Sequence, residues 1–237
     1  MKEVKATETL EAKIPKSENY KEIRPENDIT VKESKDYWDS IFSGEKQNEN
    51  NNLEFGGKYN SYEDRIGCTP RENSENGSFE GKRGESKFVP SENTEDGMKA
   101  KSKLAEYEMT GVEYKNAEPD FSKCSEATVE IDNMTEHRKD YIDRNGNYQY
   151  GNFSQADMEC AKQWNDRGKD GRTDWTARNV LNWRHKNRCS WHERCDTKTM
   201  DLVPMDIHSA CTHLGGVSEC RVRDAQGQVR VGGDFDE

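Results

Sequence analysis

The chain has 237 residues and a net charge of −11, and only 30% of its residues are hydrophobic whereas 35% are charged. This composition excludes a large hydrophobic core along the whole chain, so part of it is expected to be irregular. A stretch of about 18 apolar residues, which a membrane-spanning helix needs, is absent, and residues 1–20 lack the apolar centre of a secretory signal.

Residues 1–78 are predicted to form a charged, low-complexity N-terminal region that is largely irregular. Within it, residues 36–42 (DYWDSIF) have the amphipathic spacing of a short helix. Residues 46–57 and 71–78 are rich in asparagine, serine and glycine, which is typical of linkers. We assign no chemistry to this region.

Residues 79–150 are predicted to form an α+β region of their own. Residues 97–107 have a helix-like pattern, and residues 112–114 and 127–131 alternate as strands do, with Pro119 in the connection between them.

Residues 151–237 form the third predicted segment, which begins with two helices. Residues 153–165 carry apolar side chains at every fourth position, which indicates one buried helix face. Residues 174–186 repeat this register, and Thr173 or Asp174 is the predicted N-cap. We expect both helices to supply core around the segment that follows.

That segment, residues 188–219, holds three of the five histidines. Within it, residues 199–204 (TMDLVP) have the apolar spacing of a short strand that ends at proline, and residues 205–210 are predicted to form a helical turn. A hairpin packed on one helix places side chains from a strand opposite those of the helix, so that a metal ion fits between them.

The three histidines of this segment are the candidate metal ligands. His192, His208 and His213 offer neutral imidazoles, which suit zinc or nickel, and manganese or magnesium in mixed sites. Three protein ligands leave a position open for a substrate oxygen. Asp201 and Asp206 are weaker candidates, because aspartates are common in turns and in the first turn of a helix. His137 and His185 are predicted to be solvated.

This stretch is similar to the tryptophan–His–His branch of the HNH/endonuclease VII nucleases, which are common as toxin modules of bacterial polymorphic and contact-dependent systems. The resemblance reaches from about residue 81 to residue 223, and the segment from 113 to 135 is similar to the region that precedes the centre in such modules. The residues that match are Trp191, His192, Met200, Leu202, Val203, Pro204, Ile207, His208, His213, Gly215 and Gly216.

The resemblance implies an α+β fold with a ββα-metal (His-Me finger) motif and flanking helices. It implies His192, His208 and His213 as ligands of a divalent ion (Mg, Mn, Ni or Zn) and His192, Glu193 and His208 as catalytic residues. Glu193 departs from the family, which more often has a second histidine there. Either His192 or Glu193 is then the general base, and a carboxylate serves well only where its site raises its pKa.

Charge gives a separate indication of nucleic-acid binding. Residues 160–200 hold ten basic and five acidic residues, in contrast to the acidic chain as a whole. Because phosphates are neutralised by clustered Lys and Arg, we predict a nucleic-acid track here. Its predicted residues are Arg178, Arg184, Lys186, Arg188, Arg194 and Lys198.

The sequence therefore predicts a metal-dependent endonuclease that cleaves DNA, with RNA as the second candidate substrate. The resemblance implies a bacterial toxin made in the cytoplasm, exported without a secretory signal, acting in the cytoplasm of a target cell and neutralised by an immunity protein. The alternative is a non-catalytic zinc-stabilised binding module in which Cys195 or Cys211 completes a four-ligand site. The seven scattered cysteines lack a CxxC pair and favour free buried thiols.

Overall fold

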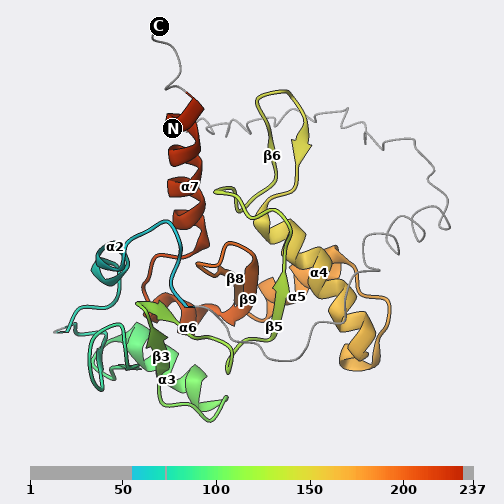
Figure 1. Ribbon diagram of the computed structural model, residues 1–237. Helices are drawn as coiled ribbons and strands as arrows, with labels where there is room; N and C mark the ends of the chain where they lie inside the picture. The colour runs from blue at the N-terminus through green and yellow to red at the C-terminus, as the bar shows by residue number, and fades with distance from the viewer. Residues whose placement is uncertain (1–54, 73, 232–237) are drawn as a thin grey trace, which may run out of the picture. The chain divides into compact units, whose positions relative to one another are not determined.

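The computed structural model describes residues 55–72 and 74–231, and we refer to these throughout (Figure 1). The helix predicted over residues 36–42 and most of the linker predicted over 46–57 lie outside them. The described residues all belong to one compact unit. No helix of the described part is long and apolar enough to cross a membrane.

The described part is a mixed α+β structure with small antiparallel sheets. Its helices are α2 (Tyr62–Gly67), α3 (Glu95–Ala105), α4 (Asn152–Arg167), α5 (Ala177–Lys186), α6 (Met205–Ala210) and α7 (Gly216–Val231), with a 3-10 turn at Lys169–Gly171. Its strands are β1 (Gly77–Phe79), β2 (Lys87–Pro90), β3 (Val112–Lys115), β4 (Glu118–Pro119), β5 (Ala127–Glu130), β6 (Tyr141–Ile142), β7 (Tyr148–Gln149), β8 (Cys189–Glu193) and β9 (Thr199–Pro204).

The strands pair as one four-stranded sheet in the order β1-β2-β3-β4, one three-stranded sheet in the order β5-β9-β8, and the hairpin β6-β7. In the three-stranded sheet β9 is central, with Ala127 opposite Leu202 on one side and His192 opposite Asp201 on the other. The pairing of β5 with β9 therefore joins the predicted segments 79–150 and 151–237.

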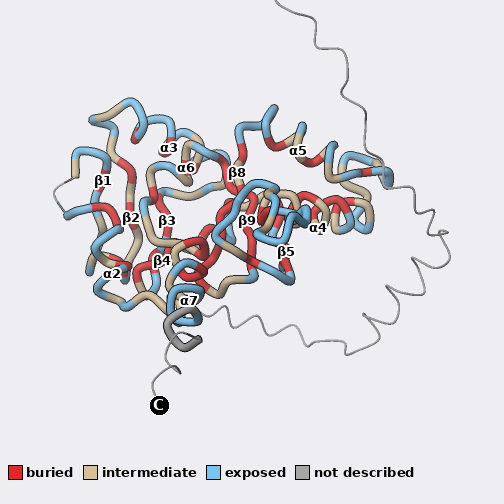
Figure 2. Tube along the Cα trace, turned by 90° about the horizontal axis from the view of Figure 1, so that it is seen from above, coloured by how far each residue is buried: buried red, intermediate tan, exposed pale blue. Residues whose placement is uncertain are grey.

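Strand β9 is buried along its whole length because two hydrophobic clusters meet on it. Met200 and Leu202 belong to a cluster with α4, α5, β5 and β8, whereas Val203 belongs to a second cluster with β2, α3, β3 and α6. Figure 2 shows α3, β2 and β3 on one side of β9, and β5, α4 and α5 on the other. An apolar strand of this kind is what burial on both faces requires.

Asp201 is the polar exception inside β9 and is fully buried. It accepts hydrogen bonds from Thr128 Oγ1 and from Arg194 Nε, both at 2.6 Å. Because both oxygens have donors, the buried carboxylate is satisfied and holds β5, β9 and the end of β8 together.

Most predicted elements agree with the structure to within two or three residues, but two expectations were wrong. Helix α5 begins after Thr176 rather than after Thr173 or Asp174. The Thr176 side chain accepts a hydrogen bond from Asn179 N, and the Asn179 side chain accepts one from Thr176 N, which together form a capping box. The linker predicted over residues 71–78 instead ends in β1, which pairs with β2.

The described residues before α2 are packed against α7 and β4. Glu219 in the first turn of α7 is fully buried and accepts hydrogen bonds from Tyr59 N at 2.6 Å and Asn60 N at 3.1 Å. Glu118 accepts one from Gly56 N at 2.7 Å. Residues 56–60 are therefore packed structure rather than tether.

Candidate metal centre

Three adjoining elements supply the histidines of the candidate centre. His192 lies near the end of β8, His208 lies in α6, and His213 lies in the short loop between α6 and α7. Pro204 ends β9 and precedes α6 directly, so the hairpin and the helix meet without a loop. The chain order of hairpin and then helix thus brings residues 16 and 21 positions after His192 back to it.

The two glycines that follow His213 allow this loop to approach β8 closely. A Cβ atom on Gly215 would lie 2.7 Å from the carbonyl oxygen of Glu193, and one on Gly216 would lie 2.4 Å from that of Arg194. Any larger residue would push the loop away from the strand end, so the HLGG sequence places His213 at the centre.

The three imidazoles converge. One ring nitrogen from each of His192, His208 and His213 lies within 4.8 Å of the other two. His213 Nε2 and His192 Nδ1 lie 3.1 Å apart. The Phe121 ring packs against the histidines and forms a T-shaped contact with His192, with the two ring centroids 4.9 Å apart.

The electrostatics of the centre keep these rings neutral. Burial is the main cause that lowers all three pKa values, and the neighbouring histidines lower those of His192 and His208 further. The pKa of His192 falls well below its usual value, that of His208 falls to about 3 and that of His213 to about 4. At neutral pH each imidazole therefore carries a lone pair, which is the form that binds metal.

A divalent ion fits this arrangement. Two nitrogens that share a tetrahedral ion at about 2.05 Å lie roughly 3.3 Å apart, close to the observed 3.1 Å between His213 and His192. His213 Nδ1 lies 2.7 Å from the Cys211 carbonyl oxygen, which fixes the proton there and leaves Nε2 with a lone pair. His192 Nε2 is buried and has no hydrogen-bond partner among the described residues.

A carboxylate and a guanidinium share the cavity with the histidines. Glu193, which is only 4% exposed, accepts hydrogen bonds from Arg138 Nε to both carboxylate oxygens, at 3.1 and 3.2 Å. Burial raises the pKa of Glu193, and the charge of Arg138 offsets part of that rise. Both residues line a cavity of about 270 Å³ together with His192, His208 and His213.

Arg138 was not identified from the sequence. It lies in a loop before β6, 54 positions before His192, and no spacing or pattern connects the two. Phe121, behind the imidazoles, was missed for the same reason. In both cases the packing of distant segments places the residue beside the centre, so no local pattern in the sequence indicates it.

The other candidate ligands lie apart from the cluster. Asp201 is committed to Arg194 and Thr128, and Asp206 lies in the first turn of α6, where it accepts a hydrogen bond from Arg188 at 3.1 Å. Within the described residues the histidine cluster includes no cysteine. All seven cysteines are free, and six of them are buried, as expected.

The six residues of the predicted nucleic-acid track fall into two groups. Arg178, Lys186, Arg188 and Lys198 are exposed. Arg184 is 7% exposed and Arg194 is 4% exposed, and each is held in a buried ion pair, with Asp157 and Asp201 respectively. These two guanidinium groups stabilise the fold through their buried partners, so we exclude Arg184 and Arg194 from the proposed phosphate contacts.

Comparison with known proteins adds one finding on the family. Residues 111–215, which include every histidine of the centre, match the family model described as the DNase/tRNase domain of colicin-like bacteriocins. No curated protein and no solved structure matches the chain. The family match covers less than half of the chain and supports a nuclease toxin domain in that part of it.

Proposed function

We propose that residues 111–215 form a metal-dependent endonuclease of the ββα-metal type, with β8, β9 and α6 as its motif. It hydrolyses phosphodiester bonds, with DNA as the first candidate substrate and RNA as the second. The observation that carries this proposal is the convergence of three neutral imidazoles beside a buried glutamate and an arginine in one cavity. The match to a DNase/tRNase family supports the same reaction class.

His192, His208 and His213 would hold the ion, and Mg, Mn, Ni and Zn are the candidates. When bound, a divalent ion stabilises the charge that develops on the phosphate and on the departing oxygen. The position left open by three ligands is where a phosphate oxygen would sit.

We assign the general base to Glu193 rather than His192. The Nδ1 atom of His192 faces His213 Nε2 at 3.1 Å, so this ring is engaged in the cluster. Glu193 lines the same cavity, and burial raises its pKa, which makes its carboxylate a stronger acceptor of the proton of an attacking water. Arg138 holds the carboxylate in place and is oriented by it.

The resemblance and the match to the bacteriocin family model support a role for this activity in a bacterial toxin. We therefore propose that the protein acts in the cytoplasm of a target cell and that an immunity protein neutralises it. In a producing strain, deletion of the immunity gene should be tolerated only when the centre is inactivated.

The deciding experiment is a cleavage assay on plasmid DNA and on folded RNA, with each of the four metals in turn and with EDTA. We expect metal-dependent cleavage by the wild-type protein and its loss in His208→Ala. The matched control is His185→Ala, because His185 is an exposed histidine on α5 outside the cluster. Wild-type cleavage by His208→Ala, or cleavage in EDTA, would refute the proposal.

A further inference from the structure

A second cavity adjoins the candidate metal centre on the side of Thr212. It has a volume of about 800 Å³, and its lining includes Thr69, Arg71, Ser74, Arg83 and Thr212. Thr212 lines the cavity of the histidines as well, so the two cavities lie on either side of this residue. Tyr114 Oη donates a hydrogen bond to the Thr212 carbonyl oxygen at 3.1 Å and fixes the position of this boundary.

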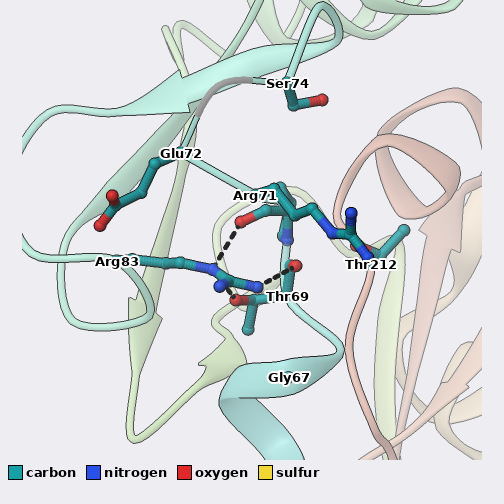
Figure 3. A pocket seen from close by; sticks show the side chains of 8 residues that line it. Gly67, Thr69, Arg71, Glu72, Ser74, Arg83 and Thr212 are labelled. Carbon is teal, nitrogen blue, oxygen red and sulfur yellow. Dashed lines mark hydrogen bonds between the residues drawn. The ribbon is translucent and has the colours of Figure 1, made fainter.

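Arg83 builds the wall of this second cavity. Its Nε donates to Thr69 Oγ1 at 2.9 Å and to the Pro70 carbonyl oxygen at 2.8 Å, and its Nη2 donates to the Thr69 carbonyl oxygen at 2.7 Å (Figure 3). These bonds hold the backbone immediately before Arg71. Within the described residues the guanidinium of Arg83 forms no ion pair with a carboxylate, so no neighbouring negative charge offsets it.

Arg71 provides a free cation in the cavity. It is exposed, and its guanidinium has no hydrogen bond or ion pair within the part of the chain that the structure describes. Figure 3 shows its side chain extending toward Thr212, whereas the carboxylate of Glu72 points the opposite way. The cavity therefore presents two guanidinium groups and the hydroxyl groups of Thr69, Ser74 and Thr212, with its one acidic side chain turned aside.

We propose that this cavity binds a phosphodiester of the substrate strand next to the one that is cleaved, with Arg71 as its contact. This inference rests on the proposed nuclease function and assigns part of its substrate path. A strand whose scissile phosphate lies among the histidines crosses Thr212 and reaches Arg71. Guanidinium groups bind phosphate oxygens through paired hydrogen bonds, and the cavity volume lies in the range that accommodates a nucleotide-sized ligand.

The path differs from the basic run predicted between residues 160 and 200. Thr69, Arg71, Ser74 and Arg83 also lie before residues 111–215, so the matched domain does not contain them. The segment around α2 and β1 thus contributes substrate affinity to a centre that other elements build. A nuclease domain without this segment would retain its cleavage of small diesters and bind long substrates more weakly.

The test compares Arg71→Glu with the wild-type protein on two kinds of substrate. The first is a labelled DNA duplex or a labelled RNA strand, measured in separate arms. The second is bis(p-nitrophenyl) phosphate, which carries a single phosphate and has no neighbouring phosphate for Arg71 to bind. We expect Arg71→Glu to lower kcat/KM on the nucleic acid roughly tenfold or more, because it loses a charge-assisted contact, and to leave the small diester unaffected. Arg71→Lys should retain most of the affinity.

Binding gives a readout that does not depend on cleavage. In EDTA, with His208→Ala as the background, Arg71→Glu should reduce the salt dependence of DNA affinity by about one phosphate contact, a change of roughly 0.9 in slope. The matched control is Arg144→Glu, which should leave the slope unchanged, because Arg144 is an exposed arginine in the turn between β6 and β7, outside the basic run of residues 160–200. The arm with the larger Arg71→Glu effect identifies DNA or RNA as the strand bound there.

The two proposals fail in different ways. An unchanged salt slope and unchanged kcat/KM in Arg71→Glu, or an equal loss on the small diester, would overturn the phosphate subsite while leaving the nuclease intact. A protein that cleaves no nucleic acid with any metal would overturn the nuclease function. The binding arm would still report on Arg71.

Discussion

The Arg138–Glu193 pair allows the assignment of the general base to be tested through the pH dependence of cleavage. We consider Arg138→Gln, which removes the cation and keeps an amide of similar reach. In the wild-type protein one guanidinium nitrogen donates to both oxygens of the buried carboxylate, at 3.1 and 3.2 Å. A hydrogen bond to a charged group contributes about 1.5–3 kcal/mol. We take the lower end, because the Arg138 side chain is 57% exposed and water screens its charge.

About 1.4 kcal/mol corresponds to one pKa unit, so loss of the cation should raise the pKa of Glu193 by about one unit. The base must be ionised to accept a proton, so the acidic limb of the pH–rate profile should move up by the same amount. The assay is single-turnover cleavage of plasmid DNA at saturating metal from pH 5 to 9. Lys139→Gln, a neighbouring exposed lysine, should leave the limb in place.

Two results would refute this reasoning. The first is an acidic limb that does not move in Arg138→Gln, because the pair would then not set the proton affinity of the base. The second is wild-type activity in Glu193→Gln, since an amide cannot accept the proton and a missing general base should lower the rate roughly 10²–10⁴-fold.

Three further predictions concern stability and binding. Arg184→Glu should lower the free energy of unfolding by about 3–5 kcal/mol in urea denaturation, because it leaves Asp157 without its buried partner, and a fully stable variant would contradict the pairing. Lys186→Glu should leave stability unchanged and flatten the salt dependence of DNA affinity, whereas an unaltered slope would exclude exposed Lys186 from the track. In EDTA, His208 and His213 have folded-state pKa values near 3 and 4, below the usual 6.5, so the unfolded state binds more protons. The free energy of unfolding should therefore fall as the pH drops below about 6.5, by about 2 kcal/mol per histidine at pH 5, and His208→Gln should remove its share.

The elements around the candidate centre were predictable because their local sequence agrees with their final environment. Residues 199–204 and 205–210 were predicted with the bounds of β9 and α6, since an apolar run that ends at proline leaves few alternatives. The three histidines were identified together from their spacing and from the family resemblance. Their convergence then followed from a hairpin that precedes a helix without a loop.

The remaining features depend on partners that are distant in sequence. Arg184 is indistinguishable from its basic neighbours until Asp157, 27 positions away, is seen to neutralise it. The role of Arg138 becomes apparent only once the fold places Glu193 beside it. The observed N-cap of α5 is Thr176 rather than Thr173 or Asp174. All three residues suit an N-cap and lie close together, so the local sequence does not distinguish them. Burial and pairing, rather than residue type, decide these cases.

The double burial of β9 has a consequence for how short an active fragment can be. One face of this strand is covered by side chains that begin at Phe88 in β2, and its flank is covered by β5. A truncated protein that starts at residue 151 would retain every imidazole of the centre, yet it would expose Val203 and Ile207 to water and leave one edge of β9 unpaired. The minimal autonomous domain should therefore begin upstream of residue 87, well before the first histidine of the centre.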